Sequence, residues 1–208
     1  MEPMSFDRTI TVALTGASGI PYALRLIESL LAADCRVYVL ASQAAAVVAK
    51  QEMDFTLPAR PQELQTFLTQ YFHAPTDQLQ VFGREEWFAP IASGSNPPDA
   101  MVVCPCTMST LASIAVGLAD NLIGRAADVV IKEGRKLILV PRETPFSAIH
   151  LENMLKLARL GVVILPANPG FYHHPQSVQD LVDFVVARIL DQLAVPHQLL
   201  ARWGDAAP

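Results

Sequence analysis

The sequence predicts an α/β domain whose parallel sheet is covered by helices on both faces. Short runs such as Ala100–Cys104 and Leu137–Val140 are apolar throughout, which is typical of strands buried on both sides. These runs alternate with segments of helical period, as in strands joined by crossover helices. The 208 residues suffice for one such domain, with a core at about 9–195 and a tail at 196–208.

Each expected element is bounded by turn or capping residues. A glycine turn separates the first strand from the first helix, and Pro58 and Pro61 separate the second helix from the third. Pro105 and Thr107 mark the start of a helix after the third strand. The expected strands are Ile10–Leu14, Val37–Ala41, Ala100–Cys104, Lys136–Val140 and Val162–Leu165. The other expected helices are Tyr22–Ala32, Ala44–Lys50, Pro61–Phe72, Asp120–Glu133, Ala148–Leu160 and Val178–Leu193.

The composition favours association between copies of the chain. Hydrophobic residues make up 51% and charged residues 17%, against roughly 25% charged in an ordinary soluble domain. The apolar runs are shorter than the ~20 residues of a spanning helix, and charged residues interrupt Leu181–Val195. We therefore expect a homo-oligomer and no membrane partner. The N-terminus shows no secretory signal, which indicates a cytoplasmic protein, and a net charge of −5 gives no reason to expect nucleic acid.

The cysteine and histidine spacings do not suit a metal site. Cys104-Pro-Cys106 lacks the spacing of a zinc knuckle and has no second pair, and His173 and His174 are adjacent. We expect no metal, and we expect Cys35, Cys104 and Cys106 to be reduced, packed thiols.

Ligands of an open parallel sheet bind beyond the carboxyl ends of its strands. The turn Thr15–Gly19 lacks the G-x-G-x-x-G spacing, and Ser42 stands where a nicotinamide site needs an acidic residue. Glycine and hydroxyl groups at helix starts suit a single phosphate instead, and Thr107–Thr110 adds three more hydroxyls. Ordinary βα turns and N-caps explain the same residues, so both alternatives stay open.

Cationic residues and one long irregular segment complete the candidate site. Arg125 and Lys132 are seven apart on an expected helix and share a face, as solvated charges often do. Arg142 and Glu143 directly follow a buried strand, where a guanidinium can hold a phosphate and a carboxyl group can move a proton. The segment Gly83–Pro98 has no periodic pattern, and long loops inside compact domains are often functional.

Short motifs follow one another in a characteristic order. They are Thr15-Gly-Ala-Ser-Gly19, Ser42, Ser93-Gly-Ser95, Cys104-Pro-Cys106, Arg125-Ala-Ala-Asp128, Lys132-Glu133, Pro141-Arg-Glu-Thr-Pro145, Phe171-Tyr-His173 and Pro175-Gln176. Together they resemble the UbiX-type flavin prenyltransferase family, from about Thr9 to Gly204. The resemblance implies a Rossmann-related, flavodoxin-like three-layer sandwich. It also implies a dodecamer with active sites at subunit junctions.

The resemblance implies an activity as well. The enzyme would join the dimethylallyl group of dimethylallyl monophosphate to N5 and C6 of reduced FMN, without a metal. The prenylated FMN would pass to a partner decarboxylase of the ubiquinone pathway. By matching position, the resemblance places FMN on Gly16, Ala17, Ser18, Ser42, Thr107, Met108 (through its backbone), Ser109, Thr110 and Arg142. It places the prenyl phosphate on Arg125, Lys132, Tyr172 and Arg188 from adjoining subunits, with Trp203 near the site, and the chemistry on Ser18, Glu52, Trp87 and Glu143.

Two other functions remain open. A flavin-dependent decarboxylase shares the implied fold, but the decarboxylases with a histidine soon after the first strand differ from Ser18-Gly-Ile-Pro-Tyr22 here. A flavin carrier without catalytic activity would need the phosphate turns but not Lys132, Glu143, Tyr172 and Arg188.

Overall fold

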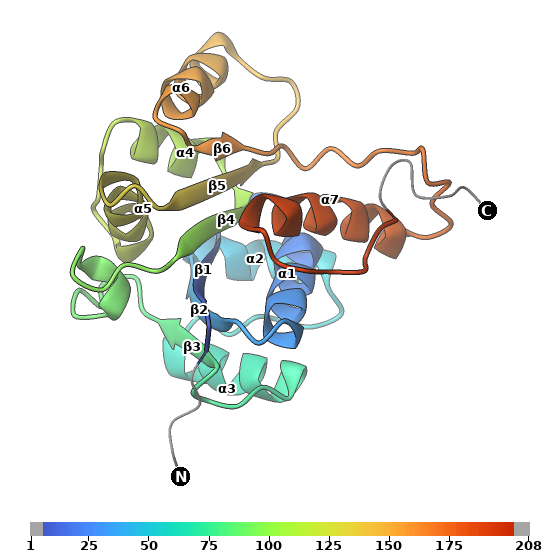
Figure 1. Ribbon diagram of the computed structural model, residues 1–208, viewed down its shortest axis with the longest axis horizontal. Helices are drawn as coiled ribbons and strands as arrows, with labels where there is room; N and C mark the ends of the chain where they lie inside the picture. The colour runs from blue at the N-terminus through green and yellow to red at the C-terminus, as the bar shows by residue number, and fades with distance from the viewer. Residues whose placement is uncertain (1–5, 202–208) are drawn as a thin grey trace.

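The computed structural model describes residues 6–201 and confirms a parallel sheet covered by helices on both faces (Figure 1). The six strands are β1 (Thr9–Leu14), β2 (Arg36–Ala41), β3 (Leu79–Phe82), β4 (Ala100–Cys106), β5 (Lys136–Pro141) and β6 (Val163–Ile164). The helices are α1 (Ile20–Ala32), α2 (Gln43–Glu52), α3 (Pro61–Phe72), α4 (Met108–Ala115), α5 (Leu122–Lys132), α6 (Ala148–Arg159) and α7 (Val178–Leu193), with a 3₁₀ turn at Pro90–Ala92.

The strands lie in the order β3-β2-β1-β4-β5-β6, and all pairs are parallel. This is the order of doubly wound Rossmann sheets, in which the chain reverses direction across the sheet between β1 and β4. Ligands of such sheets bind in the crevice at that reversal, beyond the carboxyl ends of the two strands. The turns after β1 and β4 are therefore where the fold itself opens a site.

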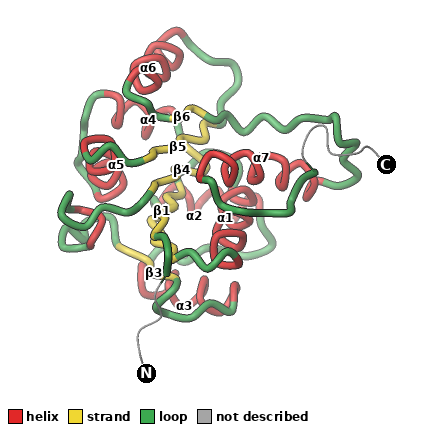
Figure 2. The backbone as a smooth tube through the Cα atoms, in the orientation of Figure 1, coloured by secondary structure: helices red, strands yellow, loops and turns green. Residues whose placement is uncertain are grey.

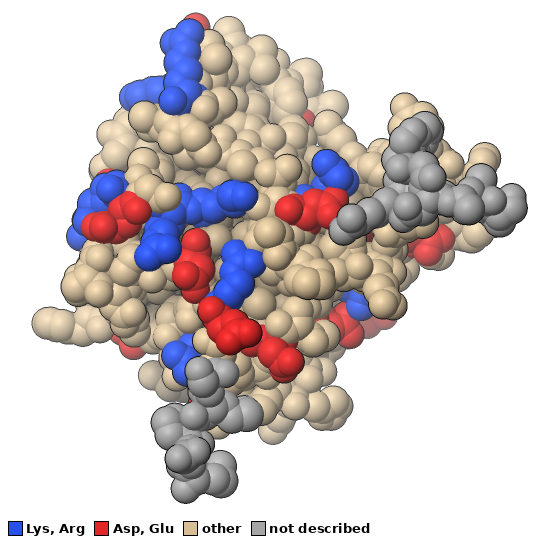
Figure 3. All heavy atoms as spheres, in the orientation of Figure 1, with Lys and Arg blue, Asp and Glu red and all other residues tan. Residues whose placement is uncertain are grey.

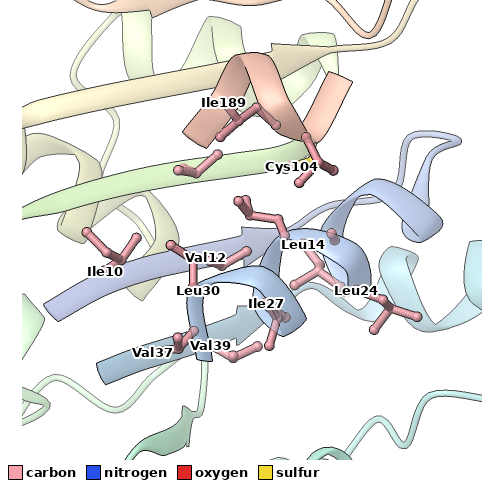
Figure 4. Close-up of a cluster of buried hydrophobic side chains, with 14 of the residues drawn as sticks. Ile10, Val12, Leu14, Leu24, Ile27, Leu30, Val37, Val39, Cys104 and Ile189 are labelled. Carbon is pink, nitrogen blue, oxygen red and sulfur yellow. The ribbon is translucent and has the colours of Figure 1, made fainter. Parts of the chain in front are cut away.

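Alternate strand residues bury their side chains against two separate helical layers. Val12 and Leu14 pack with α1, α2, α3 and α7 in one core, shown in part in Figure 4. Ala13 packs on the other side with α4, α5, α6 and the 3₁₀ turn. β4 is buried at all seven positions, as expected of a central strand covered on both faces.

The differences from the sequence prediction lie at the periphery. β3 was not predicted. Its four residues include the polar Gln80, and as an edge strand it pairs only with β2. α5 begins at Leu122 rather than Asp120, because the Asn121 side chain caps it by accepting from the amides of Ile123 and Gly124. Gly83–Pro98 is irregular apart from its 3₁₀ turn, as predicted.

The segment 165–177 between β6 and α7 extends away from the sheet before the chain returns as α7 (Figures 1 and 2). We call it the arm. The ring of His173 stacks on that of Phe184 in α7 at 5.4 Å between centroids. A Cβ at Gly170 would lie 2.9 Å from Cζ of the same phenylalanine, so only glycine fits there. The arm is thus held to α7 by contacts around the Phe184 ring and, at its end, by the amides of Gln176 and Ser177, which donate to Asp180.

Large apolar side chains remain on the surface. α6 and its flanks expose Ile149, Leu151, Leu155 and Leu160, and the end of α4 exposes Val116. Figure 3 shows Lys, Arg, Asp and Glu intermixed over one face, with a wide uncharged area around them. No helix within residues 6–201 is long and apolar enough to cross a bilayer. Several exposed apolar groups on one helix suit a surface that binds another protein.

Candidate functional site

Hydrogen bonds join the turns that follow β1 and β4. The Thr15 hydroxyl donates to the carbonyl of Pro105 at 2.7 Å and accepts from the amide of Thr107 at 2.9 Å. The Thr15 amide donates to the same Pro105 carbonyl at 3.2 Å. The two turns therefore form one rigid floor at the reversal of the sheet.

Two helices start on this floor with hydroxyl caps. Ser42 caps α2 by accepting from the amide of Ala45 at 3.1 Å. Thr107 caps α4 by accepting from the amide of Thr110 at 3.1 Å, while its own hydroxyl donates to that of Thr110 at 2.9 Å. The capping explanation therefore accounts for Ser42 and Thr107. It leaves the first amides of α4, at Met108 and Ser109, without a partner inside the helix.

The start of α1 is capped from outside. The N-cap residue Gly19 has no side chain, and the Glu52 carboxylate at the end of α2 accepts from the amides of Gly19 and Ile20 at 2.9–3.1 Å. Ser18 does not cap the helix, and its hydroxyl has no hydrogen-bond partner within residues 6–201. Because Glu52 already accepts from the amides at the start of α1, a phosphate on this floor would bind at the starts of α2 and α4.

The glycine turn lies close to its neighbours. A Cβ at Gly16 would overlap Cβ of Ala44 in the first turn of α2, so that position requires glycine. Ala17 is buried beside it. The pKa of Tyr22, on the adjacent turn of α1, is raised mainly by burial and further by Cys104 and Glu52. The neutral phenol is therefore favoured there.

Arg142 and Glu143 follow β5 at the same edge of the sheet. Both are exposed. Oε1 of Glu143 accepts from the amide of Thr144 at 3.2 Å, and Arg142 forms no ion pair or hydrogen bond with any residue between 6 and 201. An exposed guanidinium without a partner beside a phosphate-sized floor is suited to bind an anion.

Lys132 does not lie at this edge of the sheet. Lys132 ends α5, four residues before β5 begins at Lys136, so it lies at the amino edge of the sheet. Arg142 lies beyond the carboxyl end of the same strand, whose six residues span about 17 Å. The chain brings the predicted FMN residues together and keeps Lys132 apart from them. Lys132 pairs with Glu133, and Arg125 pairs with Asp128 at 2.8 Å.

The remaining predicted site residues are at the surface. Tyr172 on the arm is 80% exposed, and Arg188 on α7 pairs with Asp191 at 2.6 Å. Trp87 is half-exposed on the irregular segment. The first residues of that segment, Gly83–Glu85, line a cavity of about 270 Å³ together with Ser42. The predicted Trp203 lies outside the described residues.

The cysteines of the described chain are free and buried. Burial raises the pKa of Cys104 and Cys106 far above the ordinary thiol range and also raises that of Cys35. Within residues 6–201, no three His, Cys, Asp or Glu side chains gather where a metal ion could bind. The site chemistry available from these side chains is that of hydroxyls, amides, cations and carboxylates.

The matching family model and the similar proteins below have a flavin in common. Residues 2–190 match the family model described as Flavoprotein. A flavin prenyltransferase UbiX of Pseudomonas aeruginosa is 58% identical over 202 residues, 97% of each chain. The structure of AnUbiX (PadA1) in complex with FMN and dimethylallyl pyrophosphate superimposes with a TM-score of 0.85 at 38% identity, over 96% of this chain and 99% of that one. A dodecameric FMN-dependent UbiX-like decarboxylase from Escherichia coli O157:H7 gives 0.82 at 42% identity, over 94% and 98%.

Proposed function

The chain belongs to the UbiX-type flavin prenyltransferase family, and we propose that it joins the dimethylallyl group of dimethylallyl monophosphate to reduced FMN. In this reaction the C–O bond to phosphate breaks and inorganic phosphate leaves. Bonds form at N5 and C6 of the flavin, so the flavin gains one C5H8 unit. Prenylated FMN would then pass to a partner decarboxylase of the ubiquinone pathway.

The observation that carries this proposal is the floor at the reversal of the sheet. Its Ser18 hydroxyl and the first amides of α4 have no partner within residues 6–201, and Glu52 keeps an anion away from α1. Ser42 replaces the acidic residue that a nicotinamide ribose requires. These features fit the phosphate and ring of a flavin mononucleotide better than a dinucleotide.

The FMN phosphate is assigned to the starts of α2 and α4, with Arg142 as its cation. Gly16, Ala17, Ser42 and Thr107–Thr110 would line this part. Ser18 would orient N5, because it is the hydroxyl of the turn that no protein group holds. Glu52 lies next to it and would take part in moving the N5 proton.

The prenyl phosphate is assigned to three cations and a phenol, of which one chain keeps Lys132 apart from the floor. Lys132, Arg125, Tyr172 and Arg188 would stabilise the charge that develops on the leaving phosphate, as preorganised donors do without a metal. Trp87 would stabilise, through its π face, the cation at the tertiary carbon that forms the bond to C6, and Trp203 would lie near the site. Glu143 would relay the remaining proton.

Because Lys132 and the floor lie at opposite edges of the sheet, the site is incomplete in one chain. We propose that neighbouring copies complete it within a homododecamer. The exposed apolar side chains of α6 are suited to such contacts.

The second candidate, a flavin-dependent decarboxylase, is favoured by the name of the Escherichia coli O157:H7 structure. Mass spectrometry of the flavin released after anaerobic incubation with reduced FMN and dimethylallyl monophosphate separates the two candidates. A mass gain of one C5H8 unit supports the prenyltransferase. Unchanged flavin together with turnover of a hydroxybenzoate would support the decarboxylase, and tight FMN binding without either reaction would support a carrier.

Substitution of the proposed proton relay tests the mechanism within that assay. Glu143→Gln should lower the rate of prenylation about 10²-fold or more, while the dissociation constants of FMN and dimethylallyl monophosphate stay within about twofold. Equal losses in binding and rate would assign Glu143 to binding instead.

A further inference from the structure

The irregular segment 83–98 lies along α5 and contacts it at three places. The amide of Leu122 donates to the carbonyl of Arg84 at 2.7 Å. Nε of Arg125 donates to the carbonyl of Ala92 at 2.9 Å. At the far end of the helix, the backbone of Gly94 lies against Lys132 and Glu133. The segment therefore spans the helix that carries two of the proposed phosphate ligands.

The approach at Gly94 leaves no room for a Cβ unless the ends of Lys132 and Glu133 move. A Cβ at this position would lie 2.5 Å from Nζ of Lys132 and nearer still to Oε1 of Glu133. The φ angle of Gly94 lies outside the left-handed region that favours glycine. Contact, and not backbone conformation, is therefore why a glycine is needed here for Lys132 and Glu133 to keep these positions.

The turn around Gly94 is stiffened by its own serines. The hydroxyls of Ser93 and Ser95 lie 2.9 Å apart in a hydrogen bond, and the amide of Ser95 donates to Oγ of Ser93 at 3.3 Å. A lysine ammonium on a free stem samples many rotamers, and a rigid turn packed against it reduces that freedom. The ion pair with Glu133 holds the ammonium from the other side.

We propose that Gly94 is a positioning residue for the reaction. Its missing side chain lets the Ser93–Ser95 turn close over the Lys132–Glu133 pair, and this contact sets the ammonium where it meets the prenyl phosphate. The inference rests on the proposed function for the identity of the phosphate. The arrangement of turn, lysine and glutamate belongs to this chain.

The substitution Gly94→Ala tests the contact with little risk to folding, because the atoms it would meet are the ends of two flexible side chains. We expect the KM for dimethylallyl monophosphate to rise about tenfold, as for a displaced charge-assisted contact. The dissociation constant of FMN should stay within about twofold, since the FMN phosphate is assigned to the starts of α2 and α4 and to Arg142, and not to Lys132.

Gly83→Ala is the matched control. It lies in the same segment, its φ is also outside the left-handed region, and its Cβ would meet Cγ of Pro61 at an ordinary 3.4 Å. We expect no change in either constant.

Amine labelling followed by peptide mapping reports the lysine without any assay of activity. In Gly94→Ala the labelling rate of Lys132 should rise severalfold relative to Lys156 on α6, and in Gly83→Ala it should not. An unchanged labelling ratio overturns the inference, as does a KM that stays at the wild-type value in an enzyme that prenylates flavin. If the wild-type protein does not prenylate flavin but Gly94→Ala still shows faster labelling of Lys132, the proposed function is refuted. The positioning of Lys132 by Gly94 would then still stand.

Discussion

The Glu52 carboxylate holds the first turn of α1 in place of an N-cap side chain. Glu52→Ala would leave the amides of Gly19 and Ile20 without their acceptor. We expect the free energy of unfolding to fall by about 1–2 kcal/mol, and by less in Glu52→Gln, which keeps one oxygen. Urea unfolding measures both. Glu63→Ala is the control, since Glu63 is exposed and its pair with Arg60 at 3.3 Å is a surface pair; an equal loss in the two alanine variants would disprove the cap.

The buried thiols of Cys104 and Cys106 make stability depend on alkaline pH. Burial raises the pKa of both in the folded chain above the ordinary value of 9.0, so the folded chain keeps protons that the unfolded chain loses. The free energy of unfolding should be constant with respect to these groups below about pH 8 and fall above pH 9, by at most about 1.4 kcal/mol per pH unit for each thiol.

Urea unfolding at pH 8 and pH 10 measures this fall. The variant Cys104→Ala/Cys106→Ala loses stability at both pH values through its cavity, but its stability should decline less between them. Parallel declines in variant and wild type would show that the thiols do not contribute.

The sequence located the hydroxyl and glycine residues of the site because they follow strands whose ends meet at one edge. Ser42 and Thr107 lie on that edge as predicted. The contact between Glu52 and α1 joins residues 32 and 33 apart and depends on how α2 packs, so local patterns carry no signal for it. The same holds for Gly94, whose contact with Lys132 depends on the path of an irregular segment.

Among the elements, the middle of the arm packs on α7. His173 and Gly170 both contact the ring of Phe184. Phe184→Leu should speed hydrogen exchange in residues 166–177 about five- to tenfold, which corresponds to the loss of an aromatic pair. Exchange in α1 should not change. Val178→Ala, at an exposed position of the same helix, should not change the exchange rate of the arm. If Phe184→Leu speeds exchange throughout the chain, the substitution has lowered the overall stability instead.

Most elements were predictable because their signals are local. The bounds of α3 and α7 match the prediction, since Pro61 starts one and Ser177 caps the other. β3 was missed because an edge strand of four residues is defined by its pairing with β2, which no short window contains. The family resemblance predicted from the ordered motifs is confirmed by relatives up to 58% identical.

At the scale of the whole molecule, the sheet separates the proposed site into two parts. The floor that suits FMN lies at its carboxyl edge, and Lys132 lies at its amino edge. The apolar excess in the composition reappears as exposed side chains on α6 and at the end of α4. The sequence predicted that copies associate, but it could not tell which edge each site residue occupies, because that depends on the direction of the helix carrying it.

The separation of the two edges has a genetic consequence. A chain with Ser18→Ala keeps its amino edge intact, and a chain with Lys132→Ala keeps its carboxyl edge intact. If neighbouring copies supply different edges to one site, co-expression of the two inactive variants should restore prenylated flavin in cell extracts. Co-expression of Ser18→Ala with Ser42→Ala should not restore the product, because both variants are altered at the carboxyl edge. If the first pair forms a mixed assembly but does not complement, both edges of each site belong to one chain. Two recessive loss-of-function alleles of this protein would then behave as different complementation groups within a single gene.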